Sequence, residues 1–167
     1  PYKPTDHEFD LKGFAASIIP LLKDLGLTVS MEPGRYIVGN AGILVTKIEY
    51  VKENPLKKFL VMDAAMNDLI RPALYGSYHG IKAVRETSET IFGDLVGPVC
   101  ESGDFFAQER DLPAVKQGDL LAVMSAGAYG YAMSSNYNSR GRAAEVMVSG
   151  NRAELVHARE PVEDLVR

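Results

Sequence analysis

Cysteine, histidine and long apolar runs are scarce in this sequence, and each shortage excludes a class of protein. The single cysteine, Cys100, rules out an internal disulfide framework and fits a reducing compartment, so we expect a cytoplasmic protein. One cysteine and three scattered histidines, His7, His79 and His157, offer no spacing typical of a zinc site, and we expect no metal. No apolar stretch approaches the roughly 20 residues that span a bilayer, so we expect no membrane partner.

A strong charge of either sign is also lacking. The formal net charge is −4 at pH 7, with 24% charged and 46% hydrophobic residues, as in an ordinary globular protein. Without a basic patch or a polybasic run, the chain has no electrostatic means of attracting nucleic acid or anionic lipid. Its 167 residues are enough for one domain with a buried core, or for one domain and part of another.

The first 40 residues read as the end of an α/β unit. Apolar residues recur at helical spacing over residues 11–25 and Gly26 follows, which predicts an amphipathic helix in which Pro20 allows a kink or a break. Residues 27–31 are short, apolar and β-prone, as a buried parallel strand would be. A helix that leads into one strand is half of an α/β repeat and cannot bury itself alone. Because the sequence also starts at Pro1 without a leader, we expect it to begin inside a longer protein.

Residues 41–167 predict an antiparallel all-β barrel or sandwich. Short β-prone stretches alternate with turn signals, and Gly150-Asn151 between two alternating runs predicts a hairpin. Residues 161–166 predict one helical turn that begins at a proline. The fold class is therefore mixed, with residues 1–40 as the last helix and strand of an α/β barrel of the TIM type and residues 41–167 as a β domain. The expected strands are 43–51, 58–64, 80–84, 96–99, 119–124, 143–148 and 154–158.

Two motifs offer arginines suited to anions. Glu32-Pro33-Gly34-Arg35 follows the predicted strand, where a glycine lets the backbone approach a phosphate and an arginine binds phosphate or carboxylate. A plain turn with a surface arginine explains the same residues. The segment 66–75 places Arg71 four residues before Tyr75, a sensible pair for a carboxylate, although Pro72 argues against a regular helix there. A loop with a solvated arginine and a core tyrosine is the alternative.

Two further motifs carry a thiol and a phenol. Residues 97–104 present Cys100 beside Glu101 among glycine and proline, and a thiol can act as a general acid. A cysteine packed as a small hydrophobic residue is the alternative. In residues 127–138, Tyr129 stands between small residues, so its hydroxyl is free to reach a phosphate or a substrate, unless the aromatic run belongs to the core. No one of the four motifs is specific.

Taken in order, EPGR, NDLIRPALY, GPVCESGD and GAYGYAMSSNYN resemble the motifs of bacterial diaminopimelate decarboxylases, a family of fold-type III pyridoxal-phosphate decarboxylases. The resemblance extends from the helix before Glu32 to residues 159–165. It implies a (β/α)8 barrel whose strand ends hold pyridoxal phosphate, followed by a C-terminal β domain. It also implies a homodimer in which the partner's β domain completes each active site, and meso-diaminopimelate as the small-molecule substrate in lysine biosynthesis.

The resemblance implies roles for the residues of the first and last motifs. Glu32, Pro33, Gly34 and Arg35 match the loop that holds the phosphate of the cofactor, and Arg35 also matches a contact to the substrate carboxylate. Tyr129 matches the tyrosine that touches both cofactor and substrate.

The two middle motifs match the residues that read and protonate the substrate. Arg71 and Tyr75 match the pair at the distal end of diaminopimelate, and Glu101 matches the group that receives the distal ammonium. Cys100 matches the proton donor to the α carbon, which needs one proton after carbon dioxide leaves and the cofactor has accepted the electrons. The resemblance also implies that Cys100 and Glu101 act across the dimer interface.

The resemblance implies further parts that this sequence lacks. None of its nine lysines has the apolar-Lys-Ala-Asn context of the lysine that binds the cofactor covalently. We therefore expect the C-terminal portion of a decarboxylase, inactive by itself. A related decarboxylase of ornithine, arginine or carboxynorspermidine is one alternative, which a substrate panel distinguishes. A non-catalytic β-domain partner is another, and it predicts a longer protein without the cofactor lysine.

Overall fold

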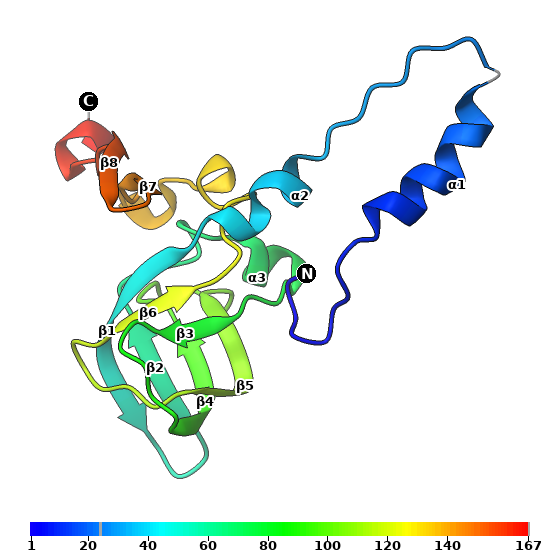
Figure 1. Cartoon of the computed structure of the whole chain (residues 1–167). Helices are drawn as coiled ribbons and strands as arrows, with labels where there is room; N and C mark the ends of the chain where they lie inside the picture. Colours follow the sequence, from blue (N-terminus) through cyan, green and yellow to red (C-terminus); the bar gives the residue numbers. More distant parts are fainter. Residues whose placement is uncertain (24, 167) are drawn as a thin grey trace.

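The computed structural model describes residues 1–23 and 25–166, and a nearly closed β barrel forms its centre (Figure 1). Six strands form one sheet in the described part of the chain, in the order β3-β6-β1-β2-β4-β5. The two edge strands, β3 and β5, contact each other, which brings the sheet close to closure. The strands are β1 (Leu44–Glu53), β2 (Lys58–Met62), β3 (Ile81–Ala83), β4 (Thr90–Val96), β5 (Phe105–Pro113) and β6 (Leu120–Val123).

Alternation along the strands builds the core of this barrel. In β1, Thr46 and Ile48 are buried whereas their neighbours face outward, because successive side chains of a strand point to opposite faces. Leu60 and Met62 of β2 are buried with Leu121 of β6 in the same way. All neighbouring pairs of the sheet are antiparallel except β2 and β4, which run parallel. The sheet is therefore mixed, where the sequence predicted a purely antiparallel one.

The N-terminal arm extends away from the barrel (Figure 1). Helix α1 (Leu11–Lys23) follows the predicted helix and contains Pro20, whereas Asp24 lies outside the described residues. The predicted strand at 27–31 is wrong, because that segment is extended without being part of a strand. A parallel strand needs a neighbour to pair with, and no described strand lies beside this segment. Its apolar side chains Leu27, Val29 and Met31 are exposed.

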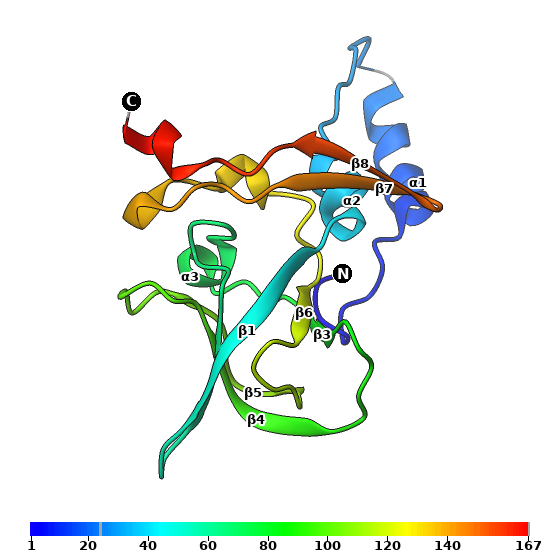
Figure 2. The ribbon, with the colours of Figure 1, turned by 90° about the vertical axis from the view of Figure 1, so that its left-hand side faces the viewer.

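The remaining elements surround one end of the barrel, and the hairpin β7–β8 lies outside it (Figures 1 and 2). The predicted hairpin is confirmed, since Ser149 pairs with Arg152 across a turn in which Gly150 has a φ of 60°. The other elements are α2 (Gly34–Val38), η1 (Gly39–Ala41), α3 (Arg71–Tyr75), η2 (Tyr131–Met133), η3 (Tyr137–Ser139), β7 (Glu145–Ser149), β8 (Arg152–His157) and η4 (Val162–Val166).

Strand prediction failed on either side of the cysteine motif. Residues 96–99 were expected to be a strand, but β4 covers Thr90–Val96 and the chain then turns. Strand β5 was missed, because Glu109, Arg110 and Asp111 interrupt its apolar alternation. In the described residues, no helix is both long and apolar enough to cross a membrane. Nor do three metal-binding side chains gather there in a group that could hold an ion.

Candidate functional site

Three of the predicted site residues lie close together at the end of the barrel that carries α2 and α3: Arg35 and Arg71 at the ring of Tyr2, and Tyr129 beside Arg71. The guanidinium carbon of Arg71 lies 4.6 Å from the centre of the Tyr2 ring, and that of Arg35 lies 5.8 Å from it. The guanidinium carbon of Arg71 is also 5.9 Å from the centre of the Tyr129 ring. Residues from four distant parts of the sequence thus share one site, which we call the arginine site (Tyr2, Arg35, Arg71, His79 and Tyr129).

Arg71 reaches this site because a short helix begins at its position. Pro72 stands in the first turn of α3, where its missing N–H leaves no hydrogen bond unmade, and Gly76 ends the helix in the left-handed conformation with a φ of 58°. Pro72 was expected to argue against a regular helix here, and that expectation is wrong. Arg71 is only 7% exposed, whereas Tyr75, at the other end of α3, is 62% exposed. The two residues thus begin and end the same five-residue helix, one buried in the arginine site and the other at the surface.

Arg71 is a buried cation without a carboxylate partner in the part of the chain that the structure describes. Its Nη1 lies 3.4 Å from Nε2 of His79, and its other contacts are the faces of Tyr2 and Tyr129. A buried charge is unfavourable unless an opposite charge or hydrogen bonds compensate it. The hydroxyl of Tyr2 is likewise buried and has no hydrogen-bond partner among the described residues. The arginine site is thus arranged to receive an anion.

Tyr129 faces this site from a strained backbone. Its φ of 59° lies in the left-handed region, which a tyrosine rarely adopts, and its side chain is half exposed. Such strain persists where the surrounding structure enforces it, often at functional sites. Gly127, two residues earlier, donates its N–H to the carbonyl of Gly39 and so ties the segment to the end of α2.

Cys100 and Glu101 lie apart from the arginine site, on the loop between β4 and β5. Cys100 is an exposed free thiol. The hydroxyl of Tyr137, from η3, donates to Oε2 of Glu101 at 3.2 Å, and the Glu101 carboxylate raises the pKa of that phenol. The structure therefore exposes both the thiol of Cys100 and the side chain of Glu101 on this loop. The phenol beside them was not predicted.

The buried carboxylate of Asp104 fixes this loop. Its Oδ2 accepts the N–H of Val99 and its Oδ1 accepts the N–H of Met66, both at 2.7 Å. Burial raises the pKa of Asp104 despite these two hydrogen bonds. A Cβ on Gly97 would meet the same carboxylate, so the close approach requires glycine. Asp104 thereby joins the thiol loop to the segment that leads into α3.

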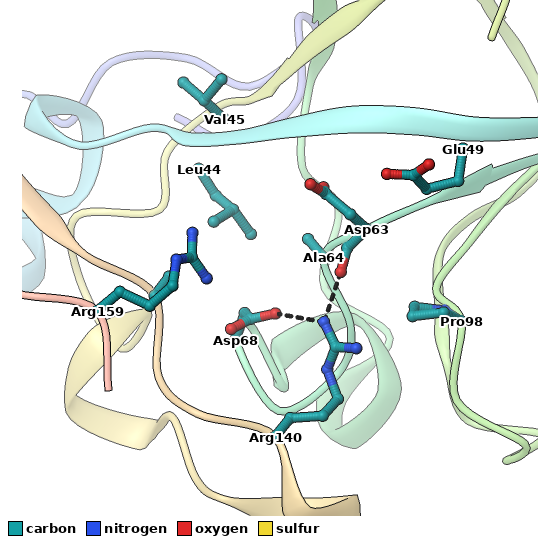
Figure 3. A pocket seen from close by; sticks show the side chains of 10 residues that line it. Leu44, Val45, Glu49, Asp63, Ala64, Asp68, Pro98, Arg140 and Arg159 are labelled. Carbon is teal, nitrogen blue, oxygen red and sulfur yellow. Dashed lines mark hydrogen bonds and ion pairs between the residues drawn. The ribbon is translucent and has the colours of Figure 1, made fainter. Parts of the chain in front are cut away.

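Arg140 also holds that segment, and two of its contacts are drawn in Figure 3. Its Nε donates to Oδ1 of Asn67 at 2.9 Å, and its Nη2 donates to the carbonyl of Asp63 and lies 3.9 Å from the carboxylate of Asp68. Burial raises the pKa of Asp68. A cavity of about 370 Å³ opens beside these groups and is also lined by Arg159. None of the predicted site residues lines it, so we assign Arg140 a role in holding the loop that positions Arg71.

A comparison with known protein families decides the family. Residues 21–127 match the model of the family described as "Pyridoxal-dependent decarboxylase, C-terminal sheet domain". The chain belongs to this family. The matched residues include the whole barrel and α3, and they stop two residues before Tyr129. The family predicted from the four motifs is confirmed.

Relatives within this decarboxylase family agree. A diaminopimelate decarboxylase of Zymomonas mobilis is 50% identical over 157 residues, which cover 94% of this chain and 37% of the relative. A crystal structure of Helicobacter pylori diaminopimelate decarboxylase complexed with L-lysine has a TM-score of 0.89 and 40% identity, and covers 97% of this chain and 40% of that one. A lysine/ornithine decarboxylase of Vibrio vulnificus complexed with cadaverine is less similar, with a TM-score of 0.73 and 26% identity over 86% of this chain and 40% of that one. The chain thus spans about two fifths of the length of these relatives.

Membership of the pyridoxal-dependent decarboxylases implies a cofactor phosphate, and the residues present fit one. Arg35 is exposed, and its guanidinium forms no hydrogen bond or ion pair with any described residue. Gly34 has open space where a Cβ would stand, and the exposed residues Glu32 and Pro33 lead into α2 beside it. The hydroxyl of Tyr129 is equally unengaged among the described residues. The guanidinium of Arg35 and the hydroxyl of Tyr129 are thus unobstructed donors for an anion.

Sequence reasoning about this decarboxylase domain missed five residues that organise the site. Tyr2 and His79 are distant in sequence from the arginines that they contact, and only the fold brings them together. Asp104 and Tyr137 stood within quoted motifs, but no spacing indicated a hydrogen-bonding role. Arg140 follows the last motif without a signal of its own.

Proposed function

We propose that this chain supplies the substrate-reading part of a pyridoxal-phosphate-dependent diaminopimelate decarboxylase. The enzyme converts meso-diaminopimelate to L-lysine and carbon dioxide, in the cytoplasm and as a homodimer. In this proposal residues 1–40 are the last helix of the cofactor-binding barrel and the segment that would form its final strand only beside the rest of that barrel, and residues 41–167 are the C-terminal β domain. One observation carries the proposal: the buried Arg71 guanidinium has no carboxylate partner among the described residues.

The substrate explains that missing partner. Diaminopimelate carries an amino-acid group at each end, so its distal carboxylate can pair with Arg71 while its distal ammonium pairs with Glu101. Ornithine and lysine have no distal carboxylate and would leave Arg71 unpaired. A site built for a charged group rejects an analogue that lacks it, because its own buried group then remains unsatisfied. Tyr75 contributes a second contact at this distal end.

The remaining residues act at the proximal end. Glu32, Pro33, Gly34 and Arg35 hold the cofactor phosphate together with Tyr129, and Arg35 also binds the substrate carboxylate. When bound, pyridoxal phosphate supplies the electron sink that allows carbon dioxide to leave. The exposed thiol of Cys100 then donates its proton to the α carbon and recovers one from solvent. Cys100 and Glu101 reach the active site of the partner subunit.

Substitution of Arg71 in the whole enzyme tests this function. We expect Arg71→Ala to raise the KM for meso-diaminopimelate by at least roughly tenfold, because it removes a contact present in both ground state and transition state. Arg152→Ala, on the exposed strand β8, is the matched control and should leave KM unchanged. A panel of diaminopimelate, ornithine, arginine, lysine and carboxynorspermidine completes the test. Faster turnover of one of the other four would overturn the assignment in favour of a related decarboxylase.

A further inference from the structure

The buried imidazole of His79 lies between the guanidinium of Arg71 and the backbone of Met124. His79 is 0% exposed and follows α3 on the segment that enters β3. Its Nε2 lies 3.4 Å from Nη1 of Arg71, and its Nδ1 lies 2.8 Å from the carbonyl oxygen of Met124, just after β6. The ring also meets the Tyr2 ring edge-on, with centroids 5.5 Å apart. Three contacts therefore fix the imidazole.

The two partners of this imidazole determine where its proton lies. A guanidinium only donates hydrogen bonds, so Nε2 must be the acceptor toward Arg71. A carbonyl only accepts, so Nδ1 must carry the hydrogen toward Met124. A neutral ring with its hydrogen on Nδ1 satisfies both contacts at once. The protonated ring would turn an N–H toward Arg71 and lose that contact.

The backbone of His79 is held as firmly as its ring. Nη1 of Arg110, on β5, donates to the carbonyl of His79 at 3.0 Å, while the Arg110 guanidinium stacks on Tyr78 with its carbon 4.0 Å from the ring centre. The N–H of Met124 donates to the carbonyl of Gly80. The backbone around His79 is thus anchored to β5 and to the residue that follows β6. Neither strand contributes a predicted ligand residue.

From this geometry we infer that His79 is a positioning residue for Arg71. Its neutral Nε2 accepts a hydrogen bond from the guanidinium, so the charge of Arg71 remains available to the substrate. The inference rests on the proposed function of Arg71. A carboxylate in the place of His79 would orient the arginine equally well but would neutralise it and compete with the distal carboxylate of the substrate. One N–H of the guanidinium points to His79, and the others remain for the ligand.

Two substitutions of His79 separate its two nitrogens in the whole enzyme. His79→Gln keeps an acceptor near the Nε2 position, whereas His79→Asn keeps only a group near Nδ1. We expect His79→Asn to raise the KM for meso-diaminopimelate by roughly tenfold with kcat changed less than about twofold, and His79→Gln to stay within roughly threefold of the parent in both constants. If His79→Asn does not fold, His79→Met fills the space without an acceptor and should show the same rise in KM. His157→Asn, an exposed histidine on β8, is the matched control and should change neither constant.

A double variant distinguishes positioning from general structural support. Once Arg71→Ala has removed the arginine, adding His79→Asn should raise KM no further, because the two residues then act through one contact. Additive effects of the two substitutions would overturn the inference, as would equal KM values for the Asn and Gln variants. If Arg71→Ala alone leaves KM unchanged, the proposed function fails and the inference fails with it. If Arg71→Ala raises KM and His79→Asn does not, only the role of His79 is refuted.

Discussion

The buried carboxylate of Asp104 offers the sharpest test of how the thiol loop is held. In Asp104→Asn, one side-chain oxygen remains as an acceptor, and the new NH₂ group faces a backbone N–H that has lost its partner. Asp104 is 4% exposed, so no bulk water replaces the lost bond. A hydrogen bond to a charged group contributes about 1.5–3 kcal/mol, and the burial that raises the Asp104 pKa offsets part of that gain. We therefore expect the loop to lose about 2 kcal/mol of stability.

Hydrogen exchange of the two backbone amides is the assay, because it reports local opening in a protein with several structural units. A loss of about 2 kcal/mol corresponds to exchange roughly 30-fold faster at Val99 and Met66. Asp111 is exposed on β5, the strand that follows this loop. Asp111→Asn should therefore change the free energy of opening at these two amides by less than about 0.5 kcal/mol. Unchanged protection of both amides in Asp104→Asn would refute the view that this carboxylate clamps the loop.

Three further outcomes are expected. Cys100→Ser should lower kcat by roughly 10²-fold or more with little change in KM, because a hydroxyl is a far weaker acid than a thiol. Tyr137→Phe removes the donor to Glu101 and should raise the KM for meso-diaminopimelate roughly threefold in steady-state assays, as for one exposed hydrogen bond. Glu160 accepts hydrogen bonds from Arg142 and Asn136, which lower its pKa from 4.5 to about 2. A carboxylate whose pKa is lowered by folding stabilises the fold fully at pH values above its ordinary pKa, and this stabilisation is lost as the pH falls toward the lowered pKa. Glu160→Gln should therefore flatten the pH dependence of unfolding between pH 4.5 and about 2.

Each of these has a control in the chain. Ser102→Ala stands beside Cys100 and should keep kcat, and Tyr50→Phe, exposed on β1, should keep KM. Glu163→Gln lies on the same C-terminal segment as Glu160 and should preserve the slope of stability against pH. A fully active Cys100→Ser would exclude the thiol as proton donor. An acid-unfolding slope that persists in Glu160→Gln would mean that other carboxylates produce it.

Local patterns in the sequence predicted the elements that depend on neighbours in sequence. Helix α1 follows a 3.6-residue period, and the β7–β8 hairpin follows the Gly150-Asn151 turn; both are decided within a few residues. The parallel pair of β2 and β4 depends on a crossover through α3 and β3, which alternation alone does not specify. The expected strand at 27–31 failed for a related reason. Its composition is that of a buried strand, but composition does not supply the neighbours that a strand needs.

The candidate site likewise has parts that the sequence could predict and parts that it could not. Arg35, Arg71, Cys100, Glu101 and Tyr129 could be named from motifs, because each motif is a continuous segment. The contacts that hold them could not, since they join segments far apart in sequence, as when the Tyr2 ring lies between the two arginines. Arg71 and Tyr75 were expected to act as neighbours, yet a helix of five residues buries one and exposes the other.

The two clamps on the segment before α3 explain how a β domain can carry specificity for a substrate whose chemistry takes place elsewhere. Asp104, on the thiol loop, fixes Met66, and Arg140 fixes Asn67. Arg71 begins α3 four residues after Asn67, so its position is set by the barrel rather than by the cofactor. In the proposed enzyme the distal end of the substrate would bind to a surface that is already formed, so little ordering entropy would oppose binding there.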